Sequence, residues 1–160
     1  MHRRFMGALP IGALLFAGLL VAGCGSSSGT TTTTAAISKA EFVAKGNGIC
    51  AVGNRKQEVE VMAFAKKHGI SEKQEPTKAQ QSELVDAVFV PSVQSQIDSV
   101  KALGAPSGEE QQVTAALESA QEALNEVKAK PELAFTKPSP FKAAGEKLHA
   151  LGLIQCAKES

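Results

Sequence analysis

Between residues 38 and 153, apolar residues recur at intervals of three and four, the spacing of one face of an α-helix. The first such segment is predicted to begin at the capping box Ser38-Lys39-Ala40-Glu41 and to run toward His68, with Gly69 as its stop. No segment here alternates apolar and polar residues with a period of two, so no strand is predicted. The predicted buried stripe of the first helix comprises Phe42, Ile49, Val52, Val59 and Ala63.

Two glycines, Gly46 and Gly53, fall on the same side of this first helix. A glycine inside a helix costs about 1 kcal/mol relative to alanine, so two on one face predict that another helix packs closely there. The alternative is a helix that breaks between Gly46 and Gly53. Lys56 and Glu60 interrupt the apolar stripe, and we expect both to reach solvent at its edge rather than to form a buried ion-binding pair.

A second helix is predicted from the cap Thr77-Lys78-Ala79-Gln80 to the stop Gly104-Ala105-Pro106. Pro91 lies inside it and has no backbone N–H, so we expect it either to kink the helix or to split it in two. The apolar face of this helix comprises Leu84, Val85, Val88, Phe89, Val93, Ile97, Val100 and Leu103.

Two further helices complete the pattern. The third follows the capping box Ser107-Gly108-Glu109-Glu110 and stops before Pro131. The fourth begins at Ser139-Pro140 and stops at Gly152. About four helices with short connections predict an all-α bundle over residues 38–160, a length sufficient to bury a core. The apolar positions are Val113, Ala116, Leu117, Ala120, Leu124 and Val127 in the third helix, and Phe141, Ala144, Leu148 and Leu151, with Leu153 returning to the core, in the fourth.

The beginning of the chain has a different pattern. Arg3 and Arg4 make a short basic start, and an apolar stretch of 16 residues follows from Gly7 to Ala22. A helix that spans a bilayer needs about 20 residues, whereas 16 suit the hydrophobic core of a secretory signal peptide. We therefore predict that residues 1–23 are a cleaved signal peptide.

The signal ends in Leu20-Val21-Ala22-Gly23-Cys24, which closely resembles the lipobox of bacterial lipoproteins. The resemblance implies cleavage between Gly23 and Cys24 and thioether attachment of a diacylglyceryl group to Cys24, with acyl chains such as palmitate. Each buried CH₂ contributes about 0.8 kcal/mol, so two acyl chains hold a protein firmly on a membrane. The next residues, Gly25 to Ala36, are only Ser, Thr, Gly and Ala, and residues 24–37 are predicted to be the lipidated cysteine and a flexible, disordered tether.

Two thiols, Cys50 and Cys156, remain in the mature chain once Cys24 is lipidated. Two cysteines in an exported domain usually pair. The alternative is a reactive thiol pair, but no Cys-x-x-Cys spacing supports it. We therefore expect one structural disulfide between the first helix and the segment after the fourth.

Charge and aromatic content exclude some classes of partner. The formal net charge of +1 comes from 17 basic and 16 acidic residues, and loss of Arg3 and Arg4 leaves 15 against 16, or −1. This balance gives no electrostatic basis for binding nucleic acid. All seven aromatic residues are Phe, which disfavours a platform for stacking sugars or bases.

Two short motifs have a known chemistry but lack its context. Glu146 and His149 have the spacing of di-iron helical bundles, but the other mature histidine, His68, has no glutamate three residues before it. Gly25-Ser26-Ser27-Ser28-Gly29 matches a nucleophile elbow, which needs a preceding strand and a following helix. We therefore expect no enzymatic activity, no cofactor and no metal.

The chain as a whole resembles small lipoproteins of unknown function from high-GC Gram-positive bacteria. The resemblance rests on the lipobox, the Ser/Thr tether, the start Ile37-Ser38-Lys39-Ala40-Glu41-Phe42 leading to Cys50, and the ending Leu151-Gly152-Leu153 before Cys156. It implies no activity. We expect a lipid-anchored protein on the extracytoplasmic face of the cell membrane that binds a protein or another envelope component. The alternative is a bundle that carries a small apolar ligand between its helices. A cavity lined by Leu, Val and Phe would favour the carrier, and an exposed apolar patch over a filled core would favour the partner-binding protein.

Overall fold

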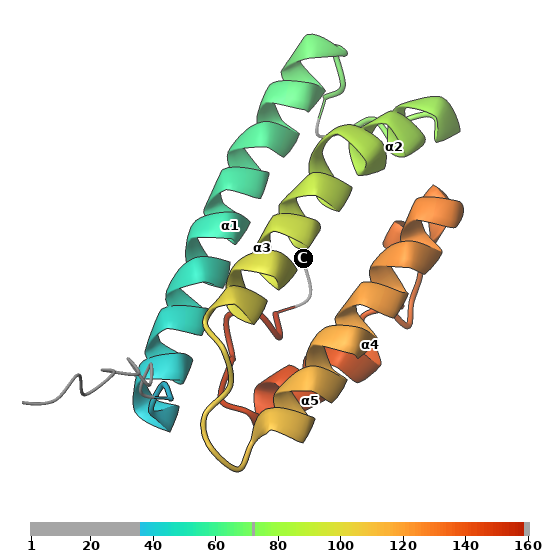
Figure 1. The fold of residues 1–160 in the computed structure, drawn as a ribbon. Helices are drawn as coiled ribbons and strands as arrows, with labels where there is room; N and C mark the ends of the chain where they lie inside the picture. Colours follow the sequence, from blue (N-terminus) through green and yellow to red (C-terminus); the bar gives the residue numbers. More distant parts are fainter. Residues whose placement is uncertain (1–35, 72, 159–160) are drawn as a thin grey trace, which may run out of the picture. The chain divides into compact units, whose positions relative to one another are not determined.

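The computed structural model describes residues 36–71 and 73–158. The signal peptide, Cys24 and nearly all of the tether lie outside the described residues, so cleavage and lipid attachment stay predictions. The described residues contain helices and no strand (Figure 1). The predicted all-α class is confirmed.

Four helical segments make up the domain. The first is α1 (Lys39–Lys67), and the second is a continuous run of α2 (Lys78–Leu84), the π-helical stretch η1 (Val85–Phe89) and α3 (Val90–Ala102). The third is α4 (Glu110–Ala129), followed by the short 3₁₀ helix η2 (Pro131–Phe135), and the fourth is α5 (Lys142–Ala150). In the bundle, α3 packs against α1 on one side and α4 on the other, and α5 packs on α4.

The first helix is unbroken over its 29 residues, which excludes the predicted alternative of a break between Gly46 and Gly53. It begins at Ser38, whose Oγ accepts a hydrogen bond from the Glu41 backbone N–H at 3.2 Å. The Glu41 carboxylate pairs with Lys45, and no hydrogen bond closes the other half of the capping box. The helix ends before Gly69, which has a φ of 66° and so adopts the left-handed conformation that favours glycine.

Two of the three glycines of α1, Gly46 and Gly53, lie close to a neighbouring segment. A Cβ atom on Gly53 would lie 2.6 Å from Cδ of Gln96 in α3, so the predicted close packing of another helix is confirmed there. At Gly46 the close neighbour is a different one: a Cβ atom would lie 2.5 Å from Cδ2 of Leu153, in the segment after α5. Leu153 is fully buried, so its side chain has little room to move aside.

A matched pair of substitutions tests the close contact between Gly46 and Leu153. Gly46→Ala and Gly48→Ala bring the same gain in helix propensity, but a Cβ at Gly48 meets nothing within 4 Å. We expect Gly48→Ala to stabilise the domain and Gly46→Ala to be less stable than Gly48→Ala by about 1–3 kcal/mol, the usual cost of overpacking. Urea unfolding of both variants measures the difference, and equal stabilities would show that Leu153 yields without cost.

The predicted buried face of α1 is right at Phe42, which is fully buried, and wrong over most of the rest of its length. Val52, Val59 and Ala63 are exposed, and Ile49 is half-buried. The reason is that α1 contacts α3, η1 and the segment after α5, all on one side, and no described element covers its other side. Lys56 and Glu60 reach solvent, as expected, with 3.7 Å between Nζ and Oε1. The buried residues of α1 are Phe42, Gly46, Cys50, Gln57 and Phe64.

Pro91 does not split the second segment, and of the two predicted outcomes the structure shows the kink, at η1. The five residues before α3 adopt π-helical geometry, and the Val90 N–H bonds to the carbonyl of Val85. A proline ring clashes with the carbonyl four residues earlier, and the wider π turn, frequently found as a single-turn bulge inside α-helices, relieves that clash. Figure 1 shows α2 turning away from the line of α3. The predicted capping box at Thr77 and Gln80 is formed.

The last two helices begin later than predicted. The predicted box of Ser107 and Glu110 does not form, because Gly108 has a φ of 84° and α4 starts only at Glu110, without a side-chain cap. The neighbouring Glu109 pairs with Lys39 of α1. The fourth helix, α5, starts at Lys142, although Ser139 Oγ does accept a hydrogen bond from the Phe141 N–H at 3.2 Å. The predicted apolar faces are otherwise confirmed as buried or half-buried.

Candidate functional site

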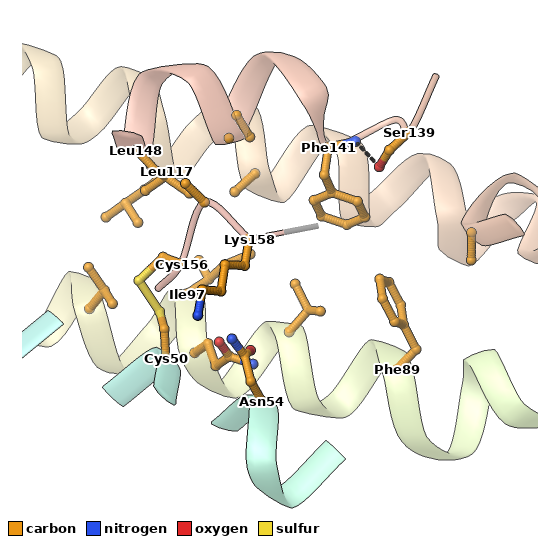
Figure 2. Close-up of a pocket in the computed structure, with 18 residues that line it drawn as sticks. Cys50, Asn54, Phe89, Ile97, Leu117, Ser139, Phe141, Leu148, Cys156 and Lys158 are labelled. Atoms are coloured by element: carbon orange, nitrogen blue, oxygen red, sulfur yellow. Dashed lines mark hydrogen bonds between the residues drawn. A yellow bond between two sulfur atoms is a disulfide. The ribbon is translucent and has the colours of Figure 1, made fainter. Parts of the chain in front are cut away.

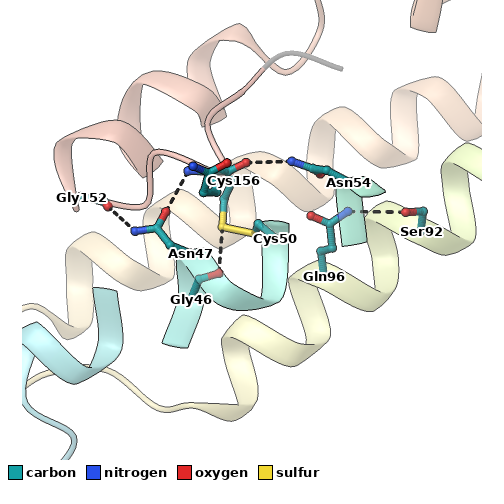
Figure 3. The surroundings of a disulfide bond; sticks show 9 residues. Gly46, Asn47, Cys50, Asn54, Ser92, Gln96, Gly152 and Cys156 are labelled. Atoms are coloured by element: carbon teal, nitrogen blue, oxygen red, sulfur yellow. Dashed lines mark hydrogen bonds between the residues drawn. A yellow bond between two sulfur atoms is a disulfide. The ribbon is translucent and has the colours of Figure 1, made fainter. Parts of the chain in front are cut away.

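The predicted disulfide between Cys50 and Cys156 is present, with the two Cα atoms 5.1 Å apart. It joins the middle of α1 to the segment that follows α5 (Figure 3). Cys50 is buried, and the sulfur of Cys156 lies 3.6 Å from the carbonyl oxygen of Gly46. The bond therefore fixes the end of the described chain against α1.

Two asparagines on α1 reinforce this attachment. Asn47 donates a hydrogen bond from Nδ2 to the carbonyl oxygen of Gly152 at 2.8 Å and accepts one at Oδ1 from the N–H of Gln155, also at 2.8 Å. Asn54 donates from Nδ2 to the carbonyl of Gln155 at 3.1 Å. The carbonyl groups of Gly152 and Gln155 and the N–H of Gln155 lie outside any helix, and the two asparagines supply their hydrogen-bond partners. Sequence reasoning missed these residues, although the intervals of three and four between Asn47, Cys50 and Asn54 place them on one helix face.

The core of the domain has two parts with a space between them. One apolar cluster surrounds the disulfide and includes Phe42, Val100 and Leu148. The other lies farther along α3 and α4 and contains Ile97 and Leu124. A cavity of about 100 Å³ is lined by members of both clusters. Three of the five residues that line it from α4 and α5 are small, namely Ala120, Ala144 and Gly145, and this leaves the space unfilled.

Every helical segment and the end of the described chain contribute to the wall of this cavity (Figure 2). The disulfide lies at one side of it, and the rings of Phe89 and Phe141 lie at another, in an edge-to-face pair with centroids 5.7 Å apart. The apolar wall residues include Val93, Ile97, Val100, Leu117, Ala120, Ala144 and Leu148. This is the Leu, Val and Phe lining that an apolar ligand requires.

Four polar side chains also line the cavity: Asn54, Gln96, Ser139 and Lys158. Asn54 and Ser139 are engaged with the backbone, as described above, and Gln96 Nε2 lies 3.5 Å from the hydroxyl of Ser92. Lys158 is exposed. The wall thus offers few polar groups, and it is chemically suited to holding a hydrocarbon rather than a sugar or a nucleotide.

The other candidate residues lie apart from the cavity. Glu146 and His149 are exposed on α5, and no group of three His, Cys, Asp or Glu side chains suited to a metal ion occurs within 36–71 and 73–158. His68 stacks on Phe64 with ring centroids 4.2 Å apart, and its Nε2 lies 3.3 Å from Oε1 of Glu83. These contacts join the end of α1 to α2.

None of the helices in the described part of the chain is both long enough and apolar enough to cross a membrane. No family model matches the chain, and neither a curated protein nor a solved structure matches it. The resemblance to small lipoproteins of high-GC Gram-positive bacteria therefore stays an expectation from the sequence.

Proposed function

We propose that this protein is a non-enzymatic lipoprotein, anchored on the extracytoplasmic face of the cell membrane, whose helical domain binds a small apolar ligand in the bundle cavity. The observation that carries the proposal is the cavity between the two halves of the core, with its lining of Val, Ile, Leu and Phe. The location is supported by the basic start, the apolar stretch and the lipobox ending at Cys24.

The size of the cavity limits the ligand. An enclosed apolar cavity of about 150 Å³ holds benzene. The space here is about 100 Å³ and is partly open, since exposed Lys158 lies at its wall, so it suits one small ring or a short segment of an alkyl chain whose end extends outward. Along the apolar part of the wall, water finds few of the two to four polar partners that it needs. Entry of a hydrocarbon restores dispersion contacts that the facing side chains lack.

Filling the cavity tests the proposal. Toluene at about ten times its dissociation constant is expected to raise the free energy of unfolding by about 1.4 kcal/mol, or the melting temperature by about 5 °C. Ala120→Leu places three more carbons at the cavity wall and is expected to abolish this rise. The unliganded variant should be as stable as the wild type or more stable, because filling a void is stabilising.

The matched control is Ala115→Leu on the exposed side of the same helix, which should keep the full response to toluene. Thermal unfolding monitored by circular dichroism measures both variants with and without toluene. Destabilisation of unliganded Ala120→Leu by about 1–3 kcal/mol, with no toluene response in the wild type, would show that packing closes the space and that the ligand proposal is wrong.

A second candidate function, contact with a protein or another envelope component, is favoured by a different observation. Val52, Val59 and Met62 of α1 are 59, 61 and 63% exposed. Three large apolar side chains in a row on one helix face are more typical of an interaction surface than of a solvated face.

A further inference from the structure

A single line of residues runs along the side of α1 that no described element covers. We call it the outer stripe. Its members alternate at intervals of three and four, which places them one above the other on the helix, and all of them are exposed. The outer stripe comprises Lys45, Gly48, Val52, Arg55, Val59, Met62 and Lys66.

The charges of the outer stripe are of one sign. It has three basic residues, and the one carboxylate that continues its spacing, exposed Glu41 four residues before Lys45, lies at its N-terminal end. Lys45 is paired with Glu41 at 2.6 Å, whereas none of the ion pairs among the described residues involves Arg55 or Lys66. Apolar side chains interleaved with cationic ones are typical of a helix that lies in the interface of an anionic bilayer.

The sequence before α1 determines how far this surface can move from a bilayer. Thirteen residues, Gly25 to Ile37, separate Cys24 from the N-cap Ser38. A flexible chain of this length has a root-mean-square span of about 20 Å, while the 29 residues of α1 extend about 43 Å. Tethering of this kind gives an effective concentration in the millimolar range. A surface affinity too weak to hold a free protein is then enough to keep the domain in contact.

We propose that the outer stripe of α1 lies on the anionic surface of the membrane that carries the anchor. Val52, Val59 and Met62 enter the boundary between head groups and acyl chains, and Arg55 and Lys66 pair with lipid phosphates. This proposal rests on the proposed lipid anchor at Cys24. It is independent of the ligand in the cavity.

Site-specific fluorescence in reconstituted vesicles tests the contact. In the lipidated full chain, Cys24 is acylated and Cys50 is bonded to Cys156, so Val59→Cys supplies one reactive thiol for an environment-sensitive dye. Vesicles of phosphatidylcholine with phosphatidylglycerol, carrying brominated acyl chains, are expected to quench the dye at position 59. The same dye on Gln112→Cys, on the exposed side of α4, is the control and should stay unquenched.

Replacing the basic residues Arg55 and Lys66 measures how much the charge of the outer stripe contributes to membrane contact. Each basic residue near an anionic surface is worth about a five-fold change in binding, so Arg55→Gln with Lys66→Gln should lower the ratio of surface-bound to free domain about thirty-fold. Lys128→Gln with Lys130→Gln, on exposed positions in and just after α4, is the matched control and should change nothing. Vesicles of phosphatidylcholine alone should quench position 59 much less.

The outcomes separate the contact from the anchor. Flotation of the whole protein with vesicles reports the anchor, and quenching at position 59 reports the stripe. Flotation with equal quenching at positions 59 and 112, or quenching that does not depend on anionic lipid, overturns the contact alone. Failure to float overturns both. A dye response at position 59 without lipid, rising with protein concentration, shows that a second copy covers the stripe and also overturns the proposal.

Discussion

Loss of the Cys50–Cys156 disulfide is expected to lower the free energy of unfolding by about 3–4.7 kcal/mol. The bond closes a loop with a sequence separation of 106 residues. On the chain-entropy model a loop of about 100 residues corresponds to about 4.7 kcal/mol at 25 °C, and measured values are often lower. Since a domain of this size is stable by only about 5–15 kcal/mol, loss of the bond removes a large part of its stability. Urea unfolding of oxidised and reduced wild-type protein measures the effect.

The double variant Cys50→Ala/Cys156→Ala separates the contribution of the covalent link to stability from the contribution of the packed sulfur atoms. Reduction removes the covalent link and keeps all heavy atoms, whereas the double variant also deletes the sulfur of Cys50 from the core, where the residue is buried. We expect the variant to be less stable than the reduced wild type. Oxidised native protein should take up no alkylating reagent, and the reduced protein two equivalents. Two reactive thiols in native protein, before any reduction, would contradict the structural role of the bond.

Replacement of Cys24 by alanine is expected to abolish lipid attachment and to move the protein out of the detergent-soluble membrane fraction. The lipobox chemistry requires a thiol as the acceptor of the diacylglyceryl group, and alanine offers none. Without two acyl chains the domain keeps at most the weak contact of the outer stripe. Metabolic labelling with radioactive palmitate, followed by immunoprecipitation, measures the loss.

Ser26→Ala, in the tether just after the lipobox, is the matched control for this substitution and should be labelled as the wild type is. The helical domain of the Cys24→Ala variant should melt as the anchored protein does, because the two apolar clusters and the disulfide all lie within residues 37–157 and are unchanged by the substitution. Labelling that survives in Cys24→Ala would contradict the lipoprotein proposal and require another site of acylation.

The helical content of this domain could be predicted from local sequence, because the signals that start and stop helices act over a few residues. Ser38 and Thr77 cap their helices as predicted, and Gly69 and Gly152, with φ of 66° and 85°, end theirs. The local signal fails at the predicted box of Ser107 and Glu110. Gly108 has a φ of 84°, outside the helical region, so α4 begins only at Glu110 and has no side-chain cap.

The buried face of α1 illustrates what periodicity leaves open. Apolar residues occur on two sides of this helix, and the sequence does not say which side meets the core. The choice of Val52 and Val59 was wrong because α1 lies at the edge of the bundle, with neighbours on one side. The disulfide could have indicated the correct side, since Cys50 faces inward, and the residues four before and seven after it, Gly46 and Gln57, are buried with it.

The disulfide could be predicted from the number and compartment of the cysteines, but the cavity could not. A cavity depends on the difference between the space that the helices enclose and the volume of the side chains that fill it. Ala120 and Ala144 appear in the sequence as ordinary core positions, and their small size leaves a void only because of how far α3 stands from α4 and α5. That separation is a property of the packed domain and not of any one helix.

The position of the disulfide also determines how the domain responds to a mechanical load. A pulling force that enters through the tether at Ser38 and leaves through Lys158 passes along α1 only as far as Cys50 and then crosses the bond to Cys156. The loop between the two cysteines, which contains α3, α4, α5 and the cavity, carries no tension. The folded length that force can unravel is therefore limited to residues 38–49. Their helical length of about 18 Å becomes about 40 Å at full extension, a gain of about 22 Å. A domain pulled between Ser38 and Lys158 would lengthen by one short stretch of helix and keep its core intact.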